Sequence, residues 1–538
     1  MIKKILHGKI NSIASAAMLV AFSSLLSRLL GVLRDRILAS SFGAGNDLDI
    51  YYAAFRLPDA LYNLIILGAL SAGFIPLFAK KIKNNQQDQS EAWKIANNLI
   101  NILGLTMLVS SAVFIIFATP LSKIFTPGFA SEKQALVVTL SRIMFLSPII
   151  LGLSGIAGGI LQSFKRFFIY SLSPIFYNIG IIIGAIYFVP LYGIVGLAWG
   201  VVLGASMHLL IQLPTLFDLG YRYQPIFDLK AKEVGQIIKL MIPRTLALSI
   251  NQIDLIVSTT IASTLSIGSL TIFNLANNLQ YFPIGIFGIS FATAAFPFFS
   301  EHAHDNKKLI EHFSKVLRQI LFFIIPSTVL FLILRAQIIR IILGAGAFNW
   351  DATNLTLQTL GFFTLSLFAQ ASIPLITRVY YAREDSKTPF IIGMITVVID
   401  IILAIILSKL MGVKGIALAY TISSIINFIL LWFVLHKQLG ELDEDVIIIA
   451  CLKFTGAALI AGIMAQLVKT LIGKMISLDT FINVVIQGSS TAIVGLGIYL
   501  VFCLIFNSKE AWGLIDSIKH RIKWNDVSKT DQSEARGI

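Results

Sequence analysis

The sequence predicts an all-α polytopic membrane protein with about fourteen transmembrane helices. We expect two pseudo-symmetric six-helix lobes around a central cavity, followed by a C-terminal helix pair. Three observations predict this class. Of the 538 residues, 56% are hydrophobic and only 13% are charged, so too little charge is present to cover a water-soluble surface. Apolar runs long enough to cross about 30 Å of hydrocarbon recur along the chain. Finally, segments of the first half recur in the second.

The apolar runs give fourteen spans. Several exceed the roughly 20 residues that a crossing needs, so they should tilt or extend past the interface. The predicted ranges are 11–40, 47–79, 92–119, 134–161, 168–189, 193–217, 235–265, 268–299, 314–344, 354–382, 388–409, 413–436, 446–472 and 480–507.

Basic residues concentrate in alternate loops. The loops at 80–83, 165–166 and 307–308 carry Lys or Arg, whereas 41–46 and 344–354 carry none. By the positive-inside rule, this places both termini in the cytoplasm, and the net charge of +14 has the same explanation. A nucleic-acid partner is not expected, because the soluble stretches are too short for a binding module.

The two halves share a pattern of small residues. Segments 191–213 and 410–432 align Gly-x-x-Gly-x-Ala at a separation of 219 residues, and LASSFGAG at 38–45 resembles IASTLSIG at 261–268. Each half holds an even number of spans, so the repeats should be parallel, which is a transporter pattern. The predicted domains are 1–220 (N-lobe), 221–440 (C-lobe), 441–508 (helices thirteen and fourteen) and 509–538 (a basic cytoplasmic tail).

Charged and polar residues interrupt the first two spans. An ionisable group within a span costs at least about 2.5 kcal/mol on insertion scales, so it normally faces a cavity. Arginine suits a pyrophosphate or carboxylate because its planar fork donates two parallel hydrogen bonds. The alternatives are an ion-pair cluster at a helix end, and snorkelling for Arg28. We take as substrate-binding candidates Ser27, Arg28, Arg34, Asp35, Asp49 and Arg56, and as hinge or kink positions Gly31 and Pro58.

The second half carries a different polar set. Arg244 and Asn278 are further substrate-binding candidates. Asp254 and Asp400 are carboxylates in apolar surroundings, and Thr421 offers another oxygen. These three are candidates for coupling to Na⁺, H⁺ or the membrane potential. The alternative pairs each Asp with an arginine of the same cavity.

No motif of an enzyme is found in the sequence. HExxH, GxSxG and GxxxxGK[ST] are missing, and the seven His are scattered. We therefore expect a transporter rather than an enzyme, with no cofactor.

Three segments resemble a known family. SRLLGVLRDRILASSFGAGNDLDIYYAAFRLPD (27–59) is similar to the N-terminal signature of the MurJ/MviN lipid II flippases, of the multidrug/oligosaccharidyl-lipid/polysaccharide exporter superfamily. YFPIGIFGISFATAAFP (281–297) and AREDSKTP (382–389) resemble its eighth helix and the loop before its eleventh. The resemblance implies export of lipid II, an undecaprenyl-pyrophosphate-linked disaccharide peptide, by alternating access across the bacterial cytoplasmic membrane.

The resemblance also implies site residues. Ser27, Arg28, Arg34, Asp35 and Asp49 would line the N-lobe cavity, and helices thirteen and fourteen would form a groove for the lipid tail. Two positions depart from the family. Tyr62 and Asn278 stand where better-known members have cavity arginines, and our hypothesis is that Arg56 and Arg244 compensate.

Other functions stay open at this point. The chain could move another polyprenyl-linked oligosaccharide, or export drugs coupled to a cation, although the drug exporter predicts an acidic or neutral N-lobe cavity. A non-transporting membrane scaffold for cell-wall synthesis is a different class, and an intramembrane enzyme lacks a motif. The expected partners are lipid II, membrane lipids and cell-wall synthesis proteins, and we expect a monomer.

Overall fold

The computed structural model describes residues 13–67, 74–84 and 90–516. Three parts of the predicted organisation lie outside these ranges. They are the start of the first span, part of the second span, and residues 517–538 of the basic tail. Within the described ranges every regular element is a helix, which confirms the predicted all-α class.

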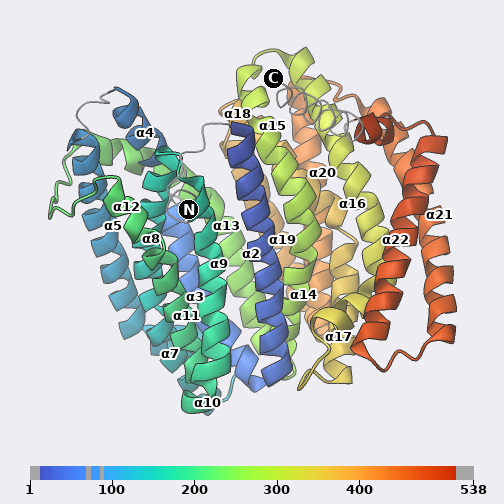
Figure 1. Ribbon diagram of the computed structural model, residues 1–538, viewed down its shortest axis with the longest axis horizontal. Coiled ribbons are helices and arrows are strands. Elements are labelled where there is room, and N and C mark those ends of the chain that lie inside the picture. The colour runs from blue at the N-terminus through green and yellow to red at the C-terminus, as the bar shows by residue number, and fades with distance from the viewer. Residues whose placement is uncertain (1–12, 68–73, 85–89, 517–538) are drawn as a thin grey trace, which may run out of the picture. The chain divides into compact units, whose positions relative to one another are not determined.

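The helices are numbered along the chain, with π-helical segments marked η (Figure 1). In the first part of the chain they are α2 (Ile13–Phe42), α3 (Asn46–Tyr62), η1 (Asn63–Leu67), α4 (Ile75–Asn84), α5 (Ser90–Ile116), α6 (Ala118–Phe125), α7 (Ser131–Met144), α8 (Leu146–Ser163), α9 (Phe167–Ile183), η3 (Gly184–Phe188), α10 (Val189–Tyr192), α11 (Val195–Leu210), α12 (Leu213–Asp218) and α13 (Lys232–Ser263). The remainder are α14 (Ser269–Pro283), η4 (Ile284–Ile289), α15 (Ser290–Glu301), α16 (Asn306–Ile342), α17 (Trp350–Thr364), α18 (Leu367–Ala382), α19 (Lys387–Met411), α20 (Val413–Leu439), α21 (Glu444–Met475) and α22 (Phe481–Ile505).

The chain forms two compact units. Unit 1 comprises Met1–Ala276, Ile342–Thr359 and Gly393–Ala419, and unit 2 comprises Asn277–Ile341, Leu360–Ile392 and Tyr420–Ile538. The lobe boundaries expected from the sequence repeat stay predictions.

The predicted count of fourteen spans is not confirmed. Eleven helices or continuous helical runs in the described residues are long and apolar enough to cross a membrane, or twelve if α17 and α18, bent by 47°, form one broken span. The two predicted spans without a counterpart, 11–40 and 47–79, lie on α2 and on α3 with η1. Both carry several charged residues, and both run into residues outside the described ranges.

The two predicted hinge positions lie inside continuous helices. Helix α2 runs through Gly31 without a break, and a Cβ atom there would lie in ordinary van der Waals contact with Asn178 of α9, at 4.0 Å. Helix α3 runs through the buried Pro58. The chain then changes to π-helical at Asn63. A proline removes one helical hydrogen bond, and a wider turn nearby is one way to accommodate the loss.

Glycines let α9 and α11 approach closely in unit 1. A Cβ atom at Gly180 would lie 2.3 Å from the Cα of Gly204, and one at Gly184 would lie 2.4 Å from the Cα of Gly200. Backbones this close have no room for a side chain, which is how small residues bring membrane helices together. Helix α9 also packs against α2, and Asn178 of α9 contacts Arg34 there.

Three loops of unit 1 interlock. Gly268 has φ +87°, and a Cβ there would lie 2.3 Å from the carbonyl oxygen of Ala44. Gly346 has φ +58°, and its Cβ would lie 2.3 Å from the carbonyl oxygen of Ser40. The loops after α2 and α13 are those that the repeat aligns, so equivalent parts of the two repeats meet here. We call this the glycine junction, comprising residues 43–45, 264–268 and 343–349.

Unit 2 has an aromatic core. Buried side chains of α15, α16, α18 and α21 form it, among them Phe299, Phe313, Phe322, Tyr380 and Phe454. Helices α21 and α22 lie side by side (Figure 1). Polar contacts also join both to α16.

Candidate functional site

Arg34 is held in a fixed orientation at the contact between α2 and α9. Its Nε and Nη2 donate to Asp35 Oδ1 at 3.0 and 2.8 Å, and its Nη1 donates to Asn178 Oδ1 at 3.1 Å. Asn178 Nδ2 donates to the carbonyl of Pro174 at 3.0 Å, which turns the amide oxygen toward the arginine. Ser27 lies 3.5 Å from the same amide nitrogen. These contacts use three of the five N–H donors of a guanidinium. Arg34 can therefore bind an anion without releasing its tethers.

Asp49 ties α3 to two other helices. Its carboxylate accepts hydrogen bonds from the backbone N–H of Gly268 (2.8 Å), from the backbone N–H and hydroxyl of Thr271 (2.9 and 2.8 Å) and from Lys133 Nζ (3.1 Å). The residue is 2% exposed. Gly268 and Thr271 flank the start of α14, so the carboxylate caps a helix whose positive end favours negative charge. These contacts occupy both oxygens of Asp49, which gives this residue a structural role in the arrangement described.

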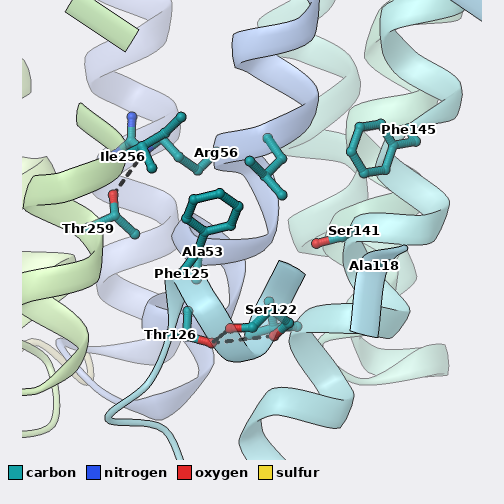
Figure 2. Close-up of a pocket in the computed structure, with 12 residues that line it drawn as sticks. Ala53, Arg56, Ala118, Ser122, Phe125, Thr126, Ser141, Phe145, Ile256 and Thr259 are labelled. Carbon is teal, nitrogen blue, oxygen red and sulfur yellow. Dashed lines mark hydrogen bonds between the residues drawn. The ribbon is translucent and has the colours of Figure 1, made fainter. Parts of the chain in front are cut away.

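Arg56 projects from α3 toward α13 and α14. Its Nε donates to Thr259 Oγ1 at 3.0 Å, and its Nη2 donates to Asn274 Oδ1 at 2.8 Å. Figure 2 shows Arg56 and Thr259 at one end of a small cavity and the hydroxyls of Ser122 and Thr126 at the other. The cavity volume is about 20 Å³. This is room for about one water molecule, so the cavity cannot hold a substrate in this conformation.

Asp254 and Asp400 form a buried carboxyl pair in unit 1. They are 8% and 3% exposed, and their carboxyl groups lie close enough to interact electrostatically. Two buried carboxyl groups that lie this close repel each other when both are charged, which favours a state in which one of them carries a proton. The guanidinium of Arg56 also interacts electrostatically with Asp254. Asp254 Oδ1 is buried and has no hydrogen-bond partner. The pair therefore has the composition of a site that exchanges a proton or binds a small cation.

The other predicted site residues are spread over both units. In unit 1, Arg28 and Tyr62 are partly exposed and Arg244 is exposed. In unit 2, Asn278 is exposed and Thr421 is buried, with its hydroxyl donating to the carbonyl of Phe362 at 2.8 Å.

No group of three or more His, Cys, Asp or Glu side chains that could hold a metal ion occurs in the described part of the chain. A Na⁺ ion at Asp254 and Asp400 would therefore need backbone carbonyl, hydroxyl or water oxygens as further ligands.

Sequence reasoning missed several partners of the site. Asn178, Lys133, Thr259 and Thr271 hold Arg34, Asp49 and Arg56 in place. A signal was available for Asn178, since it is an amide in the middle of an apolar span. Lys133 is a basic residue in one of the loops that the charge alternation predicts to be poor in Lys and Arg. Its ion pair with Asp49 gives this exception a physical reason.

Comparison with protein families gives one match over most of the chain. The model of the family described as lipid II flippase MurJ matches residues 38–486. A probable lipid II flippase MurJ of Borreliella burgdorferi is 30% identical over 447 residues, which cover 82% of this chain and 87% of the relative. The lipid II flippase MurJ of Burkholderia cenocepacia is 28% identical over 437 residues, covering 79% and 84%.

Solved structures agree with this match. A lipid II flippase MurJ in an inward closed conformation aligns with a TM-score of 0.75 at 28% identity, covering 91% of this chain and 98% of that one. An inward-facing multidrug resistance transporter of the MATE family, in the MOP superfamily, aligns with a TM-score of 0.66 at 17% identity, covering 78% and 96%. At that identity, the second likeness concerns the fold alone.

Proposed function

Since the chain belongs to the MurJ family of lipid II flippases, we propose that it moves lipid II from the inner to the outer leaflet of the bacterial cytoplasmic membrane by alternating access. The observation that carries this proposal is the family match over residues 38–486. The geometry of unit 1 supports it. Arg34 and Arg56 are partly buried guanidinium groups fixed by hydrogen bonds, and a guanidinium can donate two parallel hydrogen bonds to a pyrophosphate.

The finer assignments are part of the same proposal. Arg28, Arg34 and Arg56 would bind the anionic headgroup, with Ser27, Arg244 and Asn278 as further contacts. Asp35 would orient Arg34, and Asp49 would hold α3 in one of the two conformations. Both termini would lie in the cytoplasm because of the loop charges. The protein would act as a monomer among membrane lipids, next to cell-wall synthesis proteins, as a transporter without a cofactor.

Depletion of the protein tests the transport function. In a bacterium that depends on this gene alone for flipping, depletion should cause lipid II to accumulate in the inner leaflet, measured by its inaccessibility to an externally added lipid II-cleaving enzyme. Re-expression should restore access. Arg244→Ala in the same assay tests whether this residue replaces a family arginine, and we expect loss of rescue. Normal precursor export during depletion would refute the proposal, and full rescue by Arg244→Ala would refute the role of that residue.

Transport should also depend on the carboxyl pair. Because Asp254 and Asp400 are buried and their carboxyl groups interact, we propose that they exchange a proton or Na⁺ during the cycle. Asp254→Asn should keep the shape of the pair and remove the exchange, so transport in vesicles should no longer respond to a proton or Na⁺ gradient. Asp351→Asn, the same change at an exposed position, is the control. An unchanged gradient response in Asp254→Asn contradicts the proposal.

A further inference from the structure

A segment without regular structure joins the two sequence repeats. It comprises residues 221–231, between α12 and α13, and we call it the strap. Its side chains are largely exposed, among them Tyr223 (63%), Phe227 (51%) and Leu229 (60%). An exposed, irregular connection between two halves of a chain is ordinarily a mobile linker. The hydrogen bonds of its backbone indicate a fixed position instead.

Three asparagines of α5 bind the strap. Their amide nitrogens donate to the backbone carbonyls of residues 222, 224, 226 and 228 at 2.8 to 3.0 Å, which are alternate residues on one side of an extended segment. The asparagine amide oxygens accept from the backbone N–H groups of Gln224 (3.0 Å) and Asp228 (2.7 Å). They also accept from the hydroxyls of Tyr221 (2.9 Å) and Tyr223 (3.0 Å). We call this arrangement the asparagine clamp, comprising Asn97, Asn98 and Asn101.

Both ends of the strap are anchored in the core of unit 1. Tyr221 at one end is 7% exposed, and Ile237, in the second turn of α13 beyond the other end, is 2% exposed. Both belong to the same hydrophobic cluster as Leu99 of α5. Lys81 of α4 adds an ion pair with Glu233 of α13, at 3.5 Å. These contacts tie the first turns of α13 to helices of the first repeat.

The number of these contacts determines whether the strap opens. An intramolecular hydrogen bond typically favours the bonded state by a factor of about 2 to 10. Even at the lower value, the eight bonds of the asparagine clamp favour the docked strap by more than about a hundredfold. A strap held in this way is not a flexible hinge.

The second repeat has no comparable surface. Its third long helix, α16, corresponds in order to α5, and it contains a single asparagine, Asn306, at its first position. The asparagine clamp is therefore not a requirement of the repeated helical fold. It occurs on the repeat from which the strap leaves, which indicates that its role concerns the strap.

We infer that the asparagine clamp keeps the strap docked through the whole transport cycle. The first turns of α13 then move together with α5, although the sequence repeat assigns α13 to the second half. Helix α13 also carries Thr259, which contacts Arg56, and Asp254 of the carboxyl pair, so the clamp positions the helix that holds both. The docking itself is independent of the substrate, and only its role in transport rests on the function proposed above.

Hydrogen–deuterium exchange of the full chain in lipid nanodiscs tests the docking without substrate. The side chains of Gln224 and Asp228 are exposed, but their backbone N–H groups are bound by the clamp. We expect these two amides to exchange at least about a hundredfold more slowly than in a free peptide, because exchange requires the strap to open. Exchange of both amides at the rate of a free peptide would overturn the proposal.

A double variant identifies the asparagines as the cause. Asn97→Ala/Asn98→Ala should remove the protection of Gln224 and Asp228, while unchanged exchange in α9 and α11 shows that the variant still folds. Asn354→Ala removes an exposed asparagine that contacts the side chain of Gln358, and it should leave the strap protected. Protection that persists in the folded double variant would overturn the role of the clamp.

A reversible cross-link tests whether the strap stays docked during transport. Lys94 of α5 and Ala231 of the strap line one cavity of about 270 Å³. In a Cys451→Ala/Cys503→Ala background, Lys94→Cys/Ala231→Cys can be joined by a bifunctional methanethiosulfonate, which dithiothreitol removes. The cross-linked protein should transport lipid II as fast as the reduced protein.

The outcomes of this experiment separate the two proposals. Arrest of transport by the cross-link, with recovery after reduction, would show that the strap must open and would overturn the inference. If the unsubstituted protein does not transport lipid II in the same assay, the proposed function fails instead. The exchange measurement then still decides whether the strap is docked.

Discussion

Asp49→Ala should be the most damaging single substitution in unit 1. It removes the acceptor for two backbone N–H groups, one hydroxyl and the ammonium of Lys133, all around a residue that is 2% exposed. Breaking a buried ion pair by removing one partner typically costs about 3 kcal/mol or more, because the remaining charge has no compensation. We expect a large fall in the thermal unfolding temperature in detergent, together with loss of growth rescue.

Two variants separate the contributions to this effect. Asp47→Ala changes an exposed carboxylate two residues away and should be nearly neutral. Lys133→Met should cost less than Asp49→Ala, since the carboxylate keeps its contacts with Gly268 and Thr271. If Asp49→Ala unfolds at the same temperature as Asp47→Ala, the capping role assigned to Asp49 is wrong.

Arg34→Ala should abolish lipid II transport while the protein still folds. Asp35 and Asn178 both orient the Arg34 guanidinium. Its remaining N–H donors can still bind an anion. Arg34→Lys retains the charge but loses the planar fork, so we expect transport to fall about tenfold, the effect of one strong charge-assisted contact. Lipid II accessibility at the outer leaflet measures both variants.

The controls for Arg34 concern its tethers and its charge. Asn178→Ala should reduce transport less than Arg34→Ala, because Asp35 still holds the guanidinium. Arg142→Ala removes an exposed arginine whose Nε donates to the backbone carbonyl of Ile115, and this variant should transport normally. Normal transport by Arg34→Ala would show that Arg34 and Asp35 are merely a helix-end ion pair.

Composition and local pattern predicted the fold class and most of the spans. Hydropathy locates an apolar helix wherever the run is long enough, and twelve of the predicted ranges match the runs found. On α3 charged residues interrupt the apolar sequence, and the predicted spans on α2 and α3 both run into residues outside the described ranges. The count is therefore not confirmed at the two helices that carry most of the candidate site.

The partners of the site residues could not be predicted from local pattern. Asn178 follows Arg34 by 144 residues, and Lys133 follows Asp49 by 84. Which helix faces meet depends on packing, such as the close approach of Gly180 to Gly204, and no periodicity within one helix contains that information. The repeat was more informative, because it aligned two of the loops that meet in the glycine junction.

The glycine junction also determines where the protein can be modified for experiments. At Gly268 and Gly346 an added side chain would collide with the main chain of Ala44 and of Ser40, so fluorophores, epitope tags and inserted protease sites will be poorly tolerated there. The turn between α21 and α22 is different, since Ser477 and Asp479 are exposed in it. Distance measurements that follow the transport cycle should therefore place a probe in that turn and leave the junction unlabelled.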